Sequence, residues 1–85
     1  MGLHRFLFRK FLKMDKLHAG LIVRYIGCSQ EQINWGNNDD PRDILIIGYR
    51  YYVEHVEHHS YHTKIELRGV KGKFNSVCFQ LVAKP

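Results

Sequence analysis

The densest run of apolar positions lies between residues 44 and 56, where β-branched and aromatic side chains surround Gly48. Such side chains are enriched in strands and glycine marks a turn, so the run predicts the central strand pair of a small β-domain. Beyond Gly48 the period of two is interrupted once, because Val56 rather than His55 is the next apolar residue after Val53. This slip predicts a β-bulge near Glu54 and His55.

Shorter alternating segments predict the remaining strands. Residues 21–27 form a first strand, residues 63–67 alternate strictly, and residues 74–83 give a last strand that a short helical turn at Asn75 and Ser76 interrupts. The whole pattern predicts a mostly β fold, a highly curved five-stranded antiparallel barrel. Its predicted core consists of Val23, Ile46, Tyr51, Val53, Ile65, Leu67, Val77, Phe79 and Leu81.

A long loop follows the first strand. Residues 28–42 are rich in asparagine, aspartate, glycine and proline, which favour turns, and a connection of this length is usually functional or mobile. Ile33 and Trp35 are its large apolar residues. The tryptophan either packs back onto the barrel or is displayed as a contact anchor.

Residues 1–20 are expected to form a basic amphipathic arm ahead of a domain at 21–85. Leu3, Leu7, Phe11 and Met14 recur at helical spacing, basic residues occupy the opposite face, and Gly20 can end such a helix. Three alternatives stay open: a helix that covers one end of the barrel, a helix that makes weak membrane-surface or targeting contacts, or a natural start at Met14 that leaves the preceding residues as a disordered extension.

The net charge of +5 is unevenly distributed. The arm carries five basic residues and one acid, whereas residues 21–85 carry eight basic residues and seven acids. The charge of residues 21–85 is thus nearly balanced.

A chain of 85 residues is too small for a deep substrate cavity, and no motif places a nucleophile beside a base. We therefore expect a non-enzymatic protein that needs no cofactor.

Two further residue types bear on chemistry. Cys28 and Cys78 lie fifty positions apart without a C-x-x-C motif or secretory signal, which favours two free thiols in a reducing, cytoplasmic setting, although the first and last strands of a barrel can bring them together. His55, His58, His59 and His62 have spacings that match no helical or Cys/His zinc motif, so no metal site is expected. Their mutual repulsion below about pH 6.5 is an alternative role.

The order of features resembles the Src-homology-3-like barrels: strand, long polar loop, Gly48 with Tyr51 and Val53, hairpin, alternating strand, glycine turn, then Phe-Asn-Ser-x-x-Phe at residues 74–79. The resemblance covers residues 21–83 and is nearest to small barrels often encoded by bacteriophages and bacterial mobile elements. Peptide-binding members share an aromatic cluster at the start of the long loop and a tryptophan at the start of the third strand. This chain lacks both, which weakens the case for proline-rich ligands.

Two functions follow as expectations. The first is a protein-binding module that uses exposed loops on a rigid barrel. Its expected contact residues are Ile33, Trp35, Tyr49, Tyr52, His58 and Tyr61. The alternative is a nucleic-acid-binding barrel that uses Lys64, Arg68, Lys71 and Lys73 beside aromatic residues. Glutamates on the adjoining strands count against the alternative.

Overall fold

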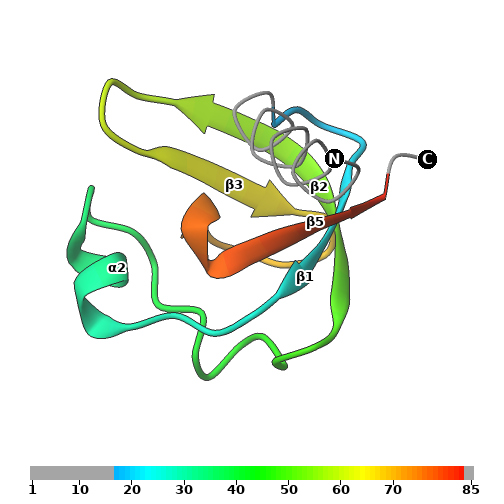
Figure 1. Ribbon diagram of the computed structural model, residues 1–85, viewed down its shortest axis with the longest axis horizontal. Helices are drawn as coiled ribbons and strands as arrows, with labels where there is room; N and C mark the ends of the chain where they lie inside the picture. The colour runs from blue at the N-terminus through cyan, green and yellow to red at the C-terminus, as the bar shows by residue number, and fades with distance from the viewer. Residues whose placement is uncertain (1–16, 84–85) are drawn as a thin grey trace, which may run out of the picture.

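A computed structural model describes residues 17–83 and shows one sheet of five antiparallel strands (Figure 1). The strands are β1 (Ile22–Tyr25), β2 (Arg50–His58), β3 (Thr63–Leu67), β4 (Phe74–Asn75) and β5 (Phe79–Ala83), and their order across the sheet is β4-β3-β2-β1-β5. A short helix, α2 (Gln30–Asn34), lies in the long loop between β1 and β2, and a 3₁₀ turn, η1 (Ser76–Cys78), separates β4 from β5. The mostly β class and the five antiparallel strands are confirmed.

The period of two explains which faces of the strands are buried. Val23 and Tyr25 in β1 are buried while Ile22 and Arg24 are more accessible, and Ile65 and Leu67 are the buried residues of β3. The pairing of β2 with β3 shifts register between Val53 and His55. The predicted bulge is therefore present, and it lets β2 bury Val53 while its later residues follow the opposite phase.

The core is a single cluster of buried side chains. Most of its members come from the strands and from the segments that enter and leave them: Leu17, Leu21, Val23, Tyr25, Leu45, Val53, Ile65, Leu67, Phe74, Cys78 and Phe79. Tyr51 and Leu81 pack at its margin as partly buried residues. The core prediction was wrong for Ile46 and Val77, which are 53% and 52% exposed.

Within residues 17–83 the sheet does not close into a barrel, which corrects the prediction of closure. Strand β4 has two residues and, among the strands that the structure describes, pairs with β3 alone, through Ile65–Phe74 and Lys64–Asn75. The side chain of Asn75 accepts a hydrogen bond from the amide of Val77 at 3.2 Å, which turns the chain into η1. Because η1 ends the edge strand so early, β4 and β5 form no ladder in the described part of the chain.

Residues 44–47 form a turn, not the first half of a strand pair. The amides of Ile44 and Leu45 both donate to the carbonyl of Pro41, at 3.0 and 2.8 Å. Of these four residues only Leu45 is buried. The apolar run thus has two roles: Leu45 anchors the turn to the core, and its apolar neighbours are exposed.

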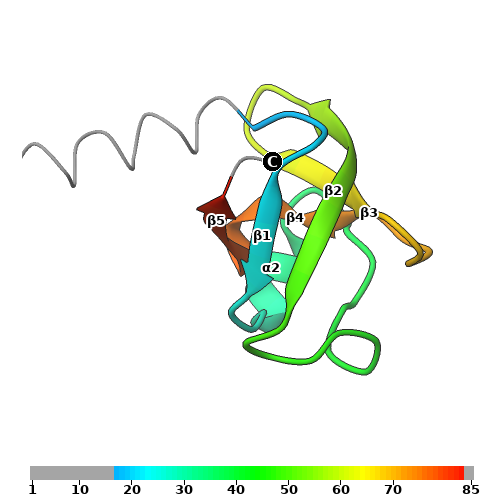
Figure 2. The same ribbon diagram turned by 90° about the vertical axis from the view of Figure 1, so that its right-hand side faces the viewer.

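The chain enters the described structure at Leu17, which is buried in the core. Gly20 adopts a φ of 96°, the left-handed conformation expected of it. The predicted amphipathic helix falls almost entirely on residues 1–16, outside the described residues. Figure 2 shows β1 and β2 side by side along the domain. Within residues 17–83, no helix is long and apolar enough to cross a membrane.

Candidate functional site

A hollow of about 480 Å³ opens between α2, η1 and the turn that joins β2 to β3. Three of its lining side chains are large, apolar and exposed, namely Trp35 (59%), Tyr61 (84%) and Val77 (52%). Its polar lining consists of Ser29, Glu31, Gln32 and Asn75. Three segments that are distant in sequence thus contribute to one surface feature. We call it the aromatic hollow.

Helix α2 forms because its first turn caps itself. The amide of Gln32 donates to Ser29 Oγ at 3.1 Å, and the amide of Ser29 donates to Gln32 Oε1 at 2.9 Å, which makes a reciprocal capping box. At the other end, Asn38 Nδ2 donates to the carbonyl of Trp35 at 2.7 Å. Because side chains form hydrogen bonds with backbone groups at both ends, a helix of only five residues is well defined.

Trp35 is exposed and yet held in place. Its indole Nε1 donates to the carbonyl oxygen of Tyr61 at 2.9 Å, across 26 positions of sequence. The tryptophan therefore crosses from the end of α2 to the β2–β3 turn. The sequence left two alternatives, a tryptophan packed onto the barrel and an exposed contact anchor. The ring combines the two, since it is exposed but a hydrogen bond to the domain fixes its orientation.

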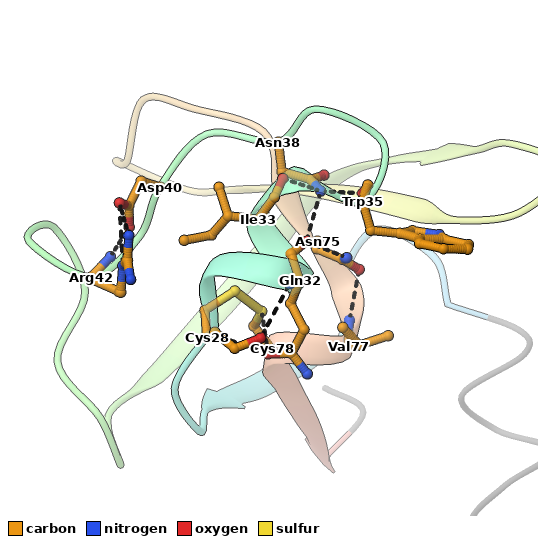
Figure 3. Close-up of a disulfide and its surroundings, with 11 residues drawn as sticks. Cys28, Gln32, Ile33, Trp35, Asn38, Asp40, Arg42, Asn75, Val77 and Cys78 are labelled. Carbon is orange, nitrogen blue, oxygen red and sulfur yellow. Dashed lines mark hydrogen bonds and ion pairs between the residues drawn. A yellow bond between two sulfur atoms is a disulfide. The ribbon is translucent and has the colours of Figure 1, made fainter.

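Asn75 and a disulfide join the two walls of the hollow (Figure 3). Asn75 is buried, and its Nδ2 donates to the carbonyl of Gln32 at 2.8 Å. Cys28, just before α2, is bonded to Cys78 of η1, with their Cα atoms 5.1 Å apart. The expectation of two free thiols is therefore wrong, whereas the proximity of the two cysteines is confirmed.

The histidines of the turn between β2 and β3 contact each other and Glu57. The rings of His59 and His62 stack with centroids 4.4 Å apart, and His59 Nε2 lies 2.6 Å from Glu57 Oε1. Lys73 Nζ donates to the second oxygen of Glu57 at 2.9 Å. These two partners, His59 first, lower the pKa of Glu57 to about 2.

The pKa of His62 is shifted downward. Partial loss of hydration is the main cause, and the neighbouring His59 and Lys64 add to it, while Glu57 opposes them. His62 therefore favours its neutral form within the stack. Among residues 17–83, no group of three or more His, Cys, Asp or Glu side chains is arranged to hold a metal ion.

Of the six predicted protein-binding residues, only Trp35 and Tyr61 meet. Ile33 is the buried residue of α2. Tyr49 is exposed but precedes the start of β2, whereas Tyr61 follows its end. Tyr52 lies under the guanidinium of Arg68, whose Cζ is 3.7 Å from the ring centroid. His58 Nε2 lies 3.2 Å from the carbonyl of Leu17, so this histidine contacts the start of the domain.

Sequence reasoning missed the remaining lining residues. Val77 was assigned to the core, but η1 rotates it outward while Ser76 and Cys78 stay buried. Ser29 and Gln32 carry a signal that could have found them, since Ser-x-x-Gln is the capping-box pattern. No comparable local signal marks Asn75, whose bond to Gln32 spans 43 positions.

Most of the basic residues that were expected to bind nucleic acid already contact other groups of the protein. Arg68 Nε donates to Glu54 at 3.1 Å, Lys73 binds Glu57, and Lys64 Nζ donates to the carbonyl of Asn37 at 3.1 Å. Hydrogen bonds to these carboxylates raise the pKa of both Arg68 and Lys73. Lys71 makes no ion pair within residues 17–83.

Comparisons of this chain with protein-family models, with curated proteins and with solved structures find no match.

Proposed function

We propose that this protein is a non-enzymatic binding module that takes a segment of another protein into the aromatic hollow. The observation that carries the proposal is the fixed but exposed indole of Trp35, held by the carbonyl of Tyr61. An aromatic side chain oriented before binding loses little conformational entropy when a partner covers it. Large aromatic anchors of this kind contribute most to the affinity of protein interfaces.

The lining of the hollow favours a protein segment over a small charged ligand. Trp35, Tyr61 and Val77 supply apolar contact, while Glu31 and Gln32 place a carboxylate and an amide beside them; the amide of Asn75 is already hydrogen-bonded to Gln32 and Val77. A peptide offers both apolar side chains and a regular series of backbone donors and acceptors, so it can satisfy both kinds of group. Glu31 is the charged side chain among the lining residues.

The nucleic-acid alternative has weaker support. The carboxylates of Glu54 and Glu57 compensate Arg68 and Lys73, and a surface already neutralised in this way attracts phosphates less strongly. Residues 21–85 also carry seven acidic side chains against eight basic ones. Contact between the arm and a membrane surface stays a prediction.

We also propose that the fold belongs with the Src-homology-3-like barrels. The order of strand, long loop, hairpin and helical turn before the last strand supports this assignment, and the open sheet marks a departure from it. An accessory role encoded by a bacteriophage or mobile element stays a prediction. A cytoplasmic location also stays a prediction, and the Cys28–Cys78 disulfide counts against it because such bonds persist in oxidising compartments.

The test compares capture of host proteins by the unaltered chain with capture by Trp35→Ala. The matched control is Tyr49→Ala, because Tyr49 is another aromatic residue with the same 59% exposure but lies outside the hollow. We expect Trp35→Ala to lower recovery of specific partners at least about ten-fold, as removal of an anchor does, and the control to retain them. Equal recovery with Trp35→Ala rejects the hollow as the binding surface.

A second measurement reports directly on the site, since Trp35 is the single tryptophan of the chain. Titration of a recovered partner should move the emission of Trp35 to shorter wavelength and saturate. Binding without any change in Trp35 emission would place the partner elsewhere.

A further inference from the structure

The turn between β2 and β3 holds two imidazole rings face to face. The amide of His59 donates to the carbonyl of His62 at 2.9 Å, which closes the turn. The rings of the same two residues stack, with centroids 4.4 Å apart and planes inclined by 18°. Imidazole is the side chain that gains a positive charge nearest to neutral pH, so acid brings like charges together in this stack.

Tyr61 connects the stack to Trp35. The oxygen that accepts the hydrogen bond of the Trp35 indole is the carbonyl oxygen of Tyr61, and the carbon of that carbonyl is bonded to the nitrogen of His62. A backbone rotation at His62 therefore moves the acceptor of the Trp35 bond. The side chain of Tyr61 also lines the hollow. Both aromatic side chains of the hollow thus depend on the conformation of this turn.

The ring of His62 fills the space between the turn and the long loop. It stacks on His59, and Gly36 lies so close to it that an added Cβ there would overlap the ring. Gly36 directly follows Trp35 in the chain. Displacement of the ring therefore opens the contact between the turn and the segment that carries the tryptophan.

Most of the groups around His62 disfavour a proton on it. Lost hydration is the main cause that lowers the pKa of His62, and His59 and Lys64 of β3 lower it further. Glu57 of β2 has the opposite effect. The balance is a lowered pKa, so the closed turn favours the neutral ring.

The nearby carboxylates already have partners. One oxygen of Glu57 lies 2.6 Å from His59 Nε2, and the other accepts from Lys73 Nζ at 2.9 Å. On the side of the long loop, Asp39 Oδ2 accepts from the amide of Lys73 at 2.7 Å. Within residues 17–83, no carboxylate forms an ion pair with His62. A charge on His62 is thus poorly compensated while the turn is closed.

We infer that the stacked histidines are an acid-sensitive switch, in which a proton on His62 separates the rings, opens the turn and frees Trp35 from the carbonyl of Tyr61. The direction follows from linkage: the closed turn disfavours the proton, so the proton disfavours the closed turn. The consequence rests on the proposed function, since a segment held in the aromatic hollow at neutral pH is released at about pH 5. Protonation of clustered histidines is a general means of opening a contact in this range.

The switch can be tested without a partner, because Trp35 is the single tryptophan of the chain. Titration of the full chain from about pH 7.5 to about pH 5 should shift Trp35 emission to longer wavelength. The midpoint of the shift should equal that of the His62 ring resonances in proton NMR spectra. Far-UV circular dichroism over the same range confirms that the sheet stays folded.

Two histidine variants separate the switch from a general effect of pH. His62→Gln keeps a polar side chain that gains no charge, so its emission should not shift over this range. The matched control is His55→Gln, because His55 is exposed on β2 and belongs to neither the stack nor the hollow. It should titrate like the unaltered chain.

The consequence for binding is measured with a partner that the unaltered chain captures at neutral pH. Its affinity should fall about ten-fold between pH 7.5 and pH 5, a change that one linked proton can produce over this interval. His62→Gln should lose most of this difference with the same partner. Any remaining pH dependence then belongs to the partner.

Each of two results would overturn the switch itself. Trp35 emission that stays constant to about pH 5 would show that the proton does not open the turn. An equal shift in His62→Gln would assign the effect to another group. Either result leaves the proposed function to the separate capture experiment with Trp35→Ala.

The binding measurement has its own contrary result. A shift in Trp35 emission without a loss of affinity would show that the freed indole does not weaken binding, which overturns the release of a segment by acid. Failure to capture any partner at neutral pH would reject the proposed function, and the emission titration would still decide whether the turn opens.

Discussion

The imidazole ring of His62 lies against the backbone of Gly36, so closely that a Cβ at Gly36 would be 2.6 Å from His62 Cδ2. Gly36 also has a φ of 87°, in the left-handed region that favours glycine. This contact joins the long loop to the β2–β3 turn one residue away from Trp35, next to its hydrogen bond with Tyr61. The orientation of Trp35 therefore depends on the space left by Gly36.

Gly36→Ala is expected to destabilise the domain and to release Trp35. The left-handed backbone costs about 1–2 kcal/mol for a residue with a Cβ, and displacement of His62 adds to that cost. Urea unfolding measures the loss, and a shift of Trp35 emission to longer wavelength reports the released indole.

The matched control is Gly69→Ala. Gly69 has a φ of 75°, but an added Cβ there would meet no atom within 4 Å. It should show the backbone cost without the change in emission. Equal effects of the two variants on stability and emission would mean that the contact with His62 is unimportant.

Stability should fall as the pH drops from 7 toward 5, because of His62. Its folded pKa is lowered, mainly by lost hydration and further by His59 and Lys64, so the native state binds protons less readily than the unfolded chain. The contribution of the neutral ring is thus present in full above the unfolded pKa of about 6.5 and is lost below it.

Urea midpoints at pH 7 and pH 5 test this dependence, and His62→Gln should reduce the difference between them. Glu57 does not interfere, because its folded pKa of about 2 leaves it charged throughout this range. A midpoint difference that is unchanged in His62→Gln would assign the pH dependence to another group.

Reduction of the Cys28–Cys78 bond should lower the free energy of unfolding by about 4 kcal/mol, the loop-closure value for a loop of this size. The comparison is between denaturation curves with and without a dithiol. Cys28→Ala, at the less buried of the two positions, should match the reduced protein and should not respond to the dithiol. Coincident curves for the oxidised and reduced chains would show that the bond adds no stability.

Binding to nucleic acid through the domain can be separated from binding through the arm. If Lys64 and Lys71 contacted phosphates, changing both to Gln would reduce the log–log salt slope by about 1.4 to 1.8. We expect any polyanion binding by the full chain to keep its slope, because residues 1–20 carry five basic side chains. A reduced slope would favour the nucleic-acid alternative over the aromatic hollow.

Local patterns predicted the local features of this fold. The strict alternation of residues 63–67 matches β3 to the residue, and the slip after Val53 matches the observed shift in register. The strand predicted for residues 44–47 was wrong, because a run of apolar residues does not reveal that a single buried one, Leu45, can anchor a turn. The sheet stays open because Asn75 caps η1 and so ends β4 after two residues.

Only part of the candidate site could be predicted, because its residues come from segments that are distant in the sequence. Trp35 and Tyr61 are conspicuous in a polar context, but their contact spans 26 positions and follows from how the loop folds back. Val77 has the alternation of a core residue and is exposed only because η1 changes the period from two to three. The Cys28–Cys78 pairing spans fifty positions and cannot be deduced from two cysteines without a motif.

The disulfide has one more consequence, for the covalent connectivity of the chain. The bond closes a ring that contains α2, β2, β3 and β4, while β1 and β5 leave it as two tails. A protease that cuts once inside the ring, for example after the exposed Arg42, opens the loop without separating the pieces. The nicked protein, heavier only by the water added in hydrolysis, stays one molecule until the disulfide is reduced, so a single cut in the long loop leaves all five strands together.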